Sequence, residues 1–145
     1  MLDARRIING SYGELWHDGQ WQTNVISVEA TVEISKEEVN RSGTRWVGHK
    51  TTSLTGTGTI NGYKVTSRWV QMIGQVANNR GVPYVTELIV KLDDPEAWGA
   101  YRVRLKNVQF DNIPLVNYEV GSLVEEEIPF TFSEFDLLDT FGPAN

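Results

Sequence analysis

Two long segments of this chain alternate between apolar and polar residues. In the first segment, the apolar positions are Ile26, Val28, Ala30, Val32 and Ile34, and the polar positions between them are Ser27, Glu29, Thr31 and Glu33. In the second segment, Leu54, Gly56, Gly58 and Ile60 alternate with Thr55, Thr57, Thr59 and Asn61. A period of two over this length predicts β-strands that have one dry face and one wet face.

A polar stretch, residues 35–50, separates these strands and is predicted to be a long loop. It is charged, contains glycine and carries one tryptophan, Trp46. Strands that pair as a hairpin are usually joined by about two to five residues. A connection roughly three times as long is either disordered or has a function of its own.

The rest of the chain predicts further strands and one helix. Strands are expected over residues 12–16, 21–34, 51–63, 83–92, 101–110, 115–124 and 128–132. A helix is expected over 65–79, because Trp69, Met72, Ile73 and Val76 recur at helical spacing. We therefore predict one α+β domain over residues 1–145 that is mostly β: an antiparallel sandwich or barrel with one packed α-helix, an N-terminal arm at 1–9 and an acidic C-terminal tail at 133–145.

Composition narrows the functional class. The chain has no cysteine, which excludes disulfides, thiolate metal sites and cysteine nucleophiles. No apolar run approaches about eighteen residues, so we expect no membrane-spanning segment. No apolar stretch follows the first arginines, so we expect no secretory signal and therefore a cytoplasmic product. The net charge is -6, and no Lys or Arg follows Tyr118. An acidic chain is poorly suited to grip nucleic acid, because that affinity comes from basic residues.

Motifs that resemble catalytic or cofactor sites lack the context that such sites need. Residues 43–51 nearly spell a phosphate-binding loop, but His49 separates Gly48 from Lys50 and the segment leads into a strand. The Gly56–Gly58 pattern has no βαβ unit around it and predicts only a strand with small residues on its inner face. Neither His17 nor His49 has a second ligand at i+2 or i+4, so no metal site is predicted, and both are expected to be solvated surface or interface histidines.

The acidic triplet 125–127 is not predicted to be a hydrolase site, because successive strand residues point to opposite faces. A solvated edge, or pairing with the basic residues of the strand 101–110, is expected instead; these are Arg102, Arg104 and Lys106. Sequence reasoning thus identifies no catalytic, cofactor-binding or metal site, and we predict that the protein is not an enzyme. Among the tryptophans, Trp46 and Trp21 are placed for a partner, so a monomeric β-sandwich module that binds carbohydrate stays an alternative.

Several stretches resemble one family. Residues 47–59 (Val-Gly-His-Lys-Thr-Thr-Ser-Leu-Thr-Gly-Thr-Gly-Thr) and 62–68 (Gly-Tyr-Lys-Val-Thr-Ser-Arg) closely resemble the tail tube protein of PBSX-type phage-like elements. So does the closing stretch 124–136, Val-Glu-Glu-Glu-Ile-Pro-Phe-Thr-Phe-Ser-Glu-Phe-Asp. Residues 8–15 and 37–39 fit more loosely, and the residues after Asp136 depart from the pattern.

The resemblance implies a structural protein with a tail-tube-like fold and no cofactor. Proteins of this family form hexameric rings that stack into the hollow inner tube of a contractile phage tail or tailocin, and each subunit's sheet joins its neighbours around the lumen. Implied partners are further copies, the tail sheath protein, and initiator or baseplate proteins, with DNA passing through without specific binding. The implied location is the bacterial cytoplasm during assembly, then the virion tail or phage-tail-like particle. A type VI secretion tube component has a similar fold and is a second alternative.

On this basis the polar face of the two alternating strands is expected to line the lumen. The residues concerned are Ser27, Glu29, Thr31, Glu33, Thr55, Thr57, Thr59 and Asn61. Such a wall is neutral to acidic and has no Lys or Arg, so it would repel the phosphates of passing DNA.

The segment 35–50 is expected to connect one ring to the next. Its contact residues are predicted to be Arg41, Arg45, Trp46, His49 and Lys50, with Trp46 anchored in a pocket of the neighbouring ring. The alternative is a mobile loop that makes no ordered contact with another subunit. The N-terminal arm and the acidic C-terminal tail are weaker candidates for interfaces.

Overall fold

The computed structural model describes residues 2–78 and 80–142, and its elements are mostly strands. In chain order they are the 3-10 turns η1 (Ala4–Arg6) and η2 (Gly10–Tyr12), then β1 (Gly13–His17), β2 (Gln20–Trp21), β3 (Val25–Val39), β4 (Gly48–Tyr63), α1 (Arg68–Ile73), the 3-10 turn η3 (Gly74–Ala77), β5 (Val85–Leu92), β6 (Tyr101–Phe110), β7 (Glu125–Phe132) and β8 (Glu134–Asp139). The predicted class, a mostly β antiparallel fold with one α-helix, is confirmed.

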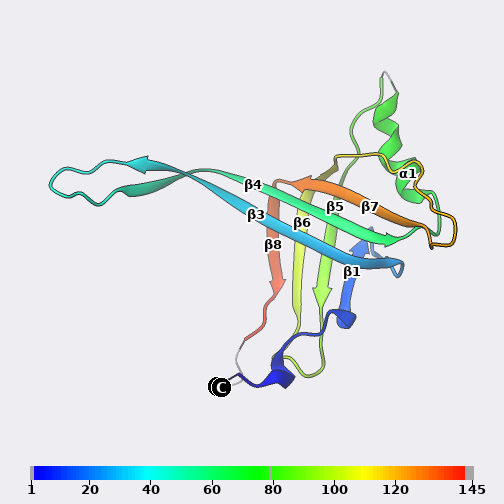
Figure 1. The fold of residues 1–145 in the computed structure, drawn as a ribbon, viewed down its shortest axis with the longest axis horizontal. Helices are drawn as coiled ribbons and strands as arrows, with labels where there is room; N and C mark the ends of the chain where they lie inside the picture. The colour runs from blue at the N-terminus through cyan, green and yellow to red at the C-terminus, as the bar shows by residue number, and fades with distance from the viewer. Residues whose placement is uncertain (1, 79, 143–145) are drawn as a thin grey trace.

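The strands form one antiparallel sheet that folds into two crossed layers. The order is β2-β1-β5-β6-β7-β4-β3, and β8 pairs with β6 beside this path. Figure 1 shows β3, β4 and β7 running across β1, β5, β6 and β8. The layers join where β6 meets β7 through only two residue pairs, Gln109 with Thr131 and Phe110 with Phe130. Such orthogonal packing needs a corner at which the chain changes layer.

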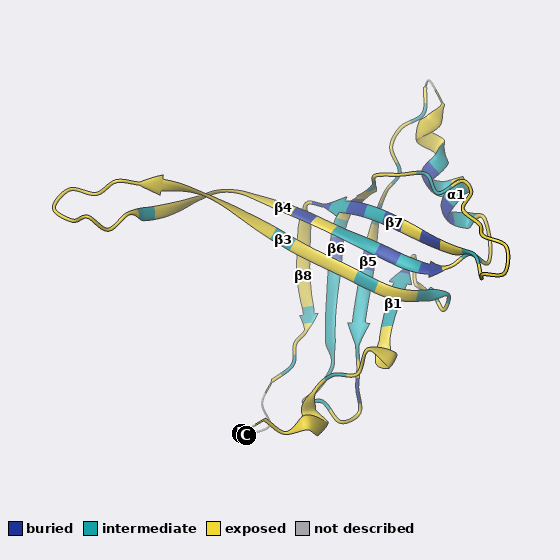
Figure 2. Ribbon diagram, in the orientation of Figure 1, coloured by how far each residue is buried: buried dark blue, intermediate teal, exposed yellow. Residues whose placement is uncertain are grey.

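The hydrophobic core lies where the two layers cross. One layer contributes Leu15, Leu88, Leu105 and Val108, the other contributes Ile60, Ile128, Phe130 and Phe132, and α1 closes one side with Trp69 and Ile73. In Figure 2 the buried positions gather on α1 and on the crossing parts of β4 and β7, whereas the far part of the β3–β4 hairpin is almost wholly exposed. The crossing therefore holds the hairpin at one end only.

Half of the segment 35–50 is strand, which corrects the prediction of one long loop. The pairing of β3 with β4 continues to Val39 opposite Gly48, so only residues 40–47 form the turn. Pairs such as Glu37 with Lys50 and Glu38 with His49 face each other across this extension. Both faces of this extension carry polar residues, so the sequence does not show the apolar–polar alternation of a half-buried strand. The backbone pairing of the two strands nevertheless continues. We call residues 34–54 the hairpin arm and residues 40–47 its tip.

The predicted acidic tail 133–145 begins with a strand. After Phe132 the chain turns at Ser133 and continues as β8, which pairs with β6 from Lys106 opposite Glu134 to Arg102 opposite Asp139. At this corner the Asn107 side chain donates a hydrogen bond to Ser133 Oγ at 2.9 Å, and Asn107 has a φ of 55°. The last three residues, 143–145, lie outside the described part of the chain.

The helix is shorter than predicted, because α1 spans only Arg68–Ile73 and continues as the 3-10 turn η3 to Ala77. Residues 65–67 are not helical, and residue 79, the predicted end, lies outside the described residues. The predicted strand 115–124 is also wrong: this segment has no regular structure, and its apolar side chains are exposed except for that of Val124. Among the described residues, no strand pairs with it to supply the hydrogen bonds of a ladder.

In the predicted N-terminal arm, residues 2–9 lie against the turn that follows β5. The buried Asp94 carboxylate accepts hydrogen bonds from the backbone N–H groups of Asn9 (2.8 Å) and Glu96 (2.9 Å). Arg6 donates to the Glu96 carbonyl oxygen at 2.8 Å and lies over the ring of Trp98. These contacts fix the arm to its own subunit.

Candidate functional site

The structure brings all eight predicted lumen residues onto one face of the β3–β4 hairpin. They stand directly opposite one another in four pairs: Ser27 with Asn61, Glu29 with Thr59, Thr31 with Thr57, and Glu33 with Thr55. Asn61 Nδ2 donates to Ser27 Oγ at 3.2 Å, which links the two strands on this face. Six of the eight are exposed, and Thr59 and Asn61 are half-buried. We call this surface the polar face.

Strand β7 extends the polar face, which sequence reasoning missed. Glu127 lies opposite Asn61, Pro129 opposite Thr59, and Thr131 opposite Thr57. The buried residues of β7 are the alternate ones, Glu126, Ile128, Phe130 and Phe132. Buried and less buried positions alternate from 125 to 132, so a period of two could have identified this strand. The pattern is hard to see in the sequence because Glu126, the middle residue of three glutamates, occupies a buried position.

The electrostatic character of the polar face is acidic. Glu29, Glu33 and Glu127 lie on it, and no Lys or Arg occurs in residues 27–35, 53–61 or 127–131. Within the described chain, none of these three carboxylates is within 4.0 Å of a basic group. The surface therefore has uncompensated negative charge, which repels polyanions.

Next to the polar face, the outer edge of β3 is free. This strand has fifteen residues and, within the part of the chain that the structure describes, pairs only with β4, at its other edge. A long strand with one unpaired edge is a template for pairing with another chain. The arm also has an apolar side, where Ile34 and Leu54 face each other and are more than half exposed, and Leu54 lines a shallow hollow together with Phe135 of β8.

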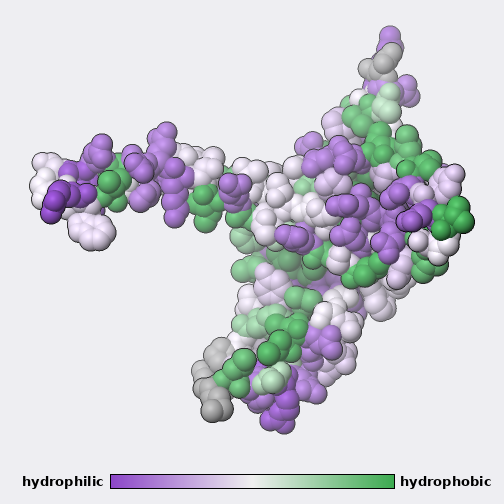
Figure 3. Space-filling view, viewed as in Figure 1, coloured by the Kyte–Doolittle hydropathy of each residue, from purple (hydrophilic) through white to green (hydrophobic). Residues whose placement is uncertain are grey.

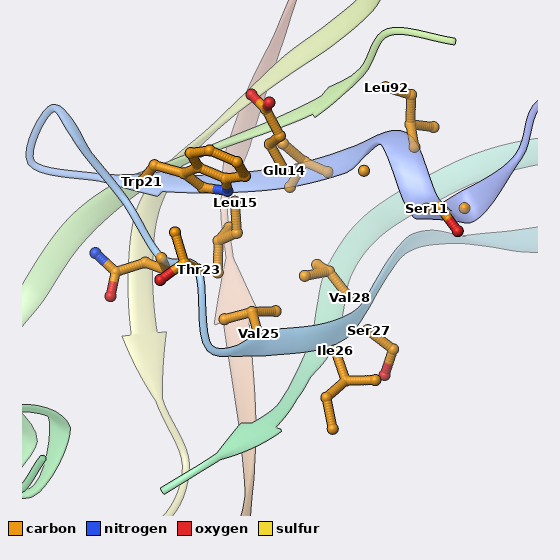
Figure 4. A pocket seen from close by; sticks show the side chains of 14 residues that line it. Ser11, Glu14, Leu15, Trp21, Thr23, Val25, Ile26, Ser27, Val28 and Leu92 are labelled. Carbon is orange, nitrogen blue, oxygen red and sulfur yellow. The ribbon is translucent and has the colours of Figure 1, made fainter. Parts of the chain in front are cut away.

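A hollow of about 410 Å³ opens beneath the start of β3, between it and β1. Leu15 on β1 and Val25 and Val28 on β3 point toward one another across it, whereas the Glu14 carboxylate points away (Figure 4). Trp21 lies at its rim, half exposed and stacked on Trp16 with ring centroids 6.4 Å apart. The hollow has no opposed acid and base in its lining that would constitute a catalytic pair.

The hairpin arm presents the predicted inter-subunit residues to solvent, with Arg41, Arg45 and Trp46 at its tip and His49 and Lys50 on β4. Trp46 is 79% exposed. Its backbone is held by two contacts: its N–H donates to Thr44 Oγ1 at 3.1 Å, and its carbonyl accepts from Arg41 at 3.4 Å. Arg45 and Lys50 have no carboxylate within 4.0 Å among the described residues. Figure 3 shows the arm as a largely hydrophilic projection away from the two layers.

At the other end of β4, Lys64 ties the irregular segment 111–124 to the sheet. Lys64 Nζ donates to the carbonyl oxygens of Pro114 (3.1 Å) and Leu115 (3.4 Å) and lies 3.7 Å from the buried Glu126 carboxylate. Burial raises the pKa of Glu126 above its usual value, and the charge of Lys64 opposes that rise. This pair is structural, since both groups belong to the inner side of the fold.

His17 is a core residue, which corrects the expectation of a solvated or interface histidine. Its Nε2 lies 3.0 Å from both Tyr84 Oη and Thr86 Oγ1, and its ring packs against Trp69 at 5.1 Å. Burial lowers the pKa of His17, so the neutral ring is favoured, although Asp18 acts in the opposite direction. His49 is exposed on the hairpin arm.

The basic residues of β6 are paired within the subunit. Arg102 lies 2.5 Å from Asp139, Lys106 lies 2.7 Å from Asp136, and Arg104 lies 3.9 Å from Glu87. The acidic partners of Arg102 and Lys106 come from β8. The expected alternative, in which these basic residues pair with the acidic triplet 125–127, is therefore not realised within the described part of the subunit, since their partners are Asp136, Asp139 and Glu87.

The described residues contain no cluster of three His, Asp or Glu side chains that would bind a metal ion. No helix among them is long and apolar enough to cross a membrane. What the geometry presents is a set of surfaces for association: a polar face, a free strand edge and an exposed tip.

Comparisons with known proteins agree with this description. The family model described as phage tail tube protein matches residues 1–139. The chain is 41% identical over 145 residues to the phage-like element PBSX protein XkdM of Bacillus subtilis (strain 168), covering 97% of this chain and 99% of that protein.

Solved structures with low sequence identity have the same fold. A chain of the anti-feeding prophage cap, the tube terminating cap, aligns with a TM-score of 0.72 at 9% identity and covers 92% of each chain. A chain of the sheath–tube complex of an extracellular contractile injection system, PVC, in its extended state aligns with a TM-score of 0.70 at 10% identity. That alignment covers 92% of this chain and 93% of the other.

Proposed function

Because this chain belongs to the phage tail tube protein family, we propose that it assembles as hexameric rings that stack into the hollow inner tube of a contractile phage tail or phage-tail-like particle. The observation that carries the proposal is the coincidence of two features on one hairpin. A polar face without Lys or Arg lies on β3 and β4, and the outer edge of β3 beside it is free for pairing.

Ring closure supplies what the isolated subunit lacks. Pairing of β3 with the sheet of the next copy satisfies the backbone groups along its free edge and covers the apolar side chains beside it. A closed ring of such contacts has no remaining edge. Six copies then present six polar faces to one central channel.

The polar face suits the wall of a channel that DNA passes. Its carboxylates repel phosphates, and its threonine and serine hydroxyls keep the surface wetted without adding positive charge. Bound counterions are not displaced when DNA passes such a wall, so no affinity develops. DNA therefore moves along the channel without specific binding.

Partners and location follow from the proposed assembly. The solved relatives include a sheath–tube complex and a tube cap. We infer that this chain contacts further copies of itself, a sheath protein around the tube, and an initiator or baseplate complex at its end. Assembly takes place in the bacterial cytoplasm, and the mature location is the tail of the virion or particle.

The experiment that tests this function is negative-stain electron microscopy of the purified protein over a concentration series, beside light-scattering mass. Rings or hollow tubes with six-fold symmetry are expected at high concentration or after addition of preformed tube ends. A monomer under every condition, together with binding of an oligosaccharide in a ligand screen, would instead favour the carbohydrate-binding module.

A further inference from the structure

The far end of β4 from the tip carries a second exposed surface that the ring contact leaves unexplained. The surface hollow there is lined by Tyr63, Asn117, Tyr118, Glu119, Ser122, Leu123 and Glu125. We call it the acidic hollow. It combines two aromatic rings and one leucine with two carboxylates, and five of these residues come from the irregular segment 111–124.

The acidic hollow is open to solvent in the subunit. Tyr118 is 73% exposed and Leu123 is 76% exposed, and both line the same hollow. Apolar side chains that cluster on a surface mark interaction sites. Neither Glu119 nor Glu125 has a basic group within 4.0 Å among the described residues. Its backbone is nevertheless positioned, because Lys64 holds the start of the segment and the Ser122 N–H closes a turn onto the Glu119 carbonyl at 3.1 Å.

The hairpin arm, with its tip, has the complementary composition. On a chain with a net charge of -6, the arm carries four basic residues, Lys36, Arg41, Arg45 and Lys50, against two acidic ones. None of the four has a carboxylate within 4.0 Å in the described parts of the chain. Trp46 adds the largest apolar side chain, also exposed. Aromatic anchors with flanking arginines are the residues that dominate binding energy at protein interfaces.

The two surfaces lie at opposite ends of one strand. β4 begins at Gly48, next to the tip, and ends at Tyr63, which lines the acidic hollow. Sixteen strand residues extend roughly 50 Å, so the tip cannot reach the hollow of its own subunit. Figure 1 shows the tip and the segment 111–124 at the two ends of the hairpin. Complementary patches at opposite ends make a heterologous contact, which propagates instead of closing.

We propose that the acidic hollow is the receptor for the hairpin tip of a second copy of this chain, with Trp46 against Tyr63, Tyr118 and Leu123 and with Arg45 beside Glu119 and Glu125. This inference rests on the proposed tube and identifies the contact between successive rings. It also gives the irregular segment a role, because Tyr118 and Leu123 would be covered when rings stack.

Cysteine crosslinking tests the contact directly, because the chain has no cysteine of its own. Ser42→Cys marks the tip and Ser122→Cys marks the acidic hollow, and both are nearly isosteric changes. Ser11→Cys is the matched control, since Ser11 lines the different hollow between β1 and β3. Mixed Ser42→Cys and Ser122→Cys proteins, assembled and treated with a bifunctional thiol reagent, are expected to give a covalent dimer, whereas the Ser42→Cys and Ser11→Cys mixture gives none.

Charge reversal tests the energetics of the same contact. Arg45→Glu or Glu119→Lys alone is expected to raise the critical concentration for assembly about tenfold or more, because like charges then meet. The double variant carries a complementary pair at every contact and is expected to return to within about threefold of wild type. Glu96→Lys, on the turn that holds the N-terminal arm, serves as the control and leaves the critical concentration unchanged.

The possible outcomes separate this inference from the proposed function. If wild-type protein forms tubes but the tip crosslinks to Ser11→Cys and not to Ser122→Cys, the acidic hollow is not the receptor. The same conclusion follows if the double variant assembles no better than the single variants. In both cases the proposed tube assembly is unaffected. If wild-type protein forms no rings or tubes even with preformed ends, both the tube and this contact are overturned.

Discussion

Phe130 on β7 lies over Gly58 on β4, in the space that a Cβ atom at position 58 would occupy. A Cβ there would stand 2.8 Å from Cε2 of the Phe130 ring and 2.5 Å from the carbonyl oxygen of Glu29. Phe132 covers Gly56 in the same way, with Cε2 at 2.6 Å. The alternate glycines of this strand therefore make room for two core rings, which confirms the prediction that the inner face of the strand needs small residues.

Gly58→Ala is expected to lower the free energy of unfolding by about 1–3 kcal/mol, because an added methyl group forces the Phe130 ring or the β3 backbone to shift. Chemical denaturation followed by tryptophan fluorescence measures the change. Gly10→Ala is the control, since a Cβ at position 10 has no neighbour within 4 Å. Equal stability of the two variants would contradict the close packing of Phe130 on Gly58.

Lys64→Met is expected to destabilise the subunit by about 2 kcal/mol at pH 7, because the Glu126 carboxylate is then buried without its partner. Burial already raises the pKa of Glu126, so its ionised form costs folding free energy as the pH rises through that pKa. The deficit should therefore shrink as the pH falls toward 4.5, the usual value. Urea titrations at several pH values give the comparison.

A matched control for that variant is Lys91→Met, which removes the exposed pair with Asp93 at 3.7 Å. Exposed pairs contribute about 0–1 kcal/mol, so a small and nearly pH-independent effect is expected. A Lys64→Met deficit no larger than that of Lys91→Met at pH 7 would show that the buried pair does not stabilise the fold.

The pKa of the buried His17 is lowered, so its contribution to stability is complete above about pH 6.5 and is lost as the pH falls through that value. For one proton the slope is at most about 1.4 kcal/mol per pH unit. His17→Gln should remove this slope, whereas His49→Gln, on the exposed arm, should retain it. Thermal melts between pH 7.5 and pH 5 would therefore separate the two variants, and parallel curves would count against a buried neutral His17.

Trp46→Ala is expected to leave the subunit folded and to weaken assembly. The side chain is 79% exposed, so its loss removes little packing within the subunit. As an interface anchor it is expected to contribute about 2 kcal/mol or more, which corresponds to roughly a thirtyfold rise in critical concentration. Sedimentation of assembled material measures this change, and Trp46→Phe should recover part of it. Unchanged assembly would argue against an anchoring role.

Replacing Glu29 and Glu33 by lysine is expected to make assembled tubes retain DNA. The amount of DNA retained should decrease steeply as the salt concentration rises. The two side chains are exposed on the polar face, so the fold should tolerate the change. Co-sedimentation of double-stranded DNA with tubes provides the measurement, and Glu87→Lys, on the exposed side of the other layer, is the control. If only the Glu87→Lys tubes bound DNA, the polar face would not be the channel wall.

Most of the strands could be predicted from local pattern. The half-buried segments around Ile60 and Leu88 alternate clearly, because one face of each meets the core and the other meets water. The same rule failed for residues 35–39 and 48–50, where a hairpin is paired but not buried and the side chains carry no periodic signal. It failed in the opposite sense at 115–124, where a strand-like pattern has no partner strand within the subunit.

The sequence by itself determined the family, the mostly β class, the absence of cysteine chemistry and the alternation that sorts the hairpin into a polar and an apolar face. Those properties depend on residue identity and on neighbours close in the chain. Only the tertiary structure decided that Glu127 and Thr131 join the polar face, that His17 is buried, and that the tip and the acidic hollow lie at opposite ends of β4. Each of these features depends on which strands pair and on how the two layers cross. Contacts between segments that are distant in the chain produce no periodic pattern in the local sequence, so the sequence alone does not predict them.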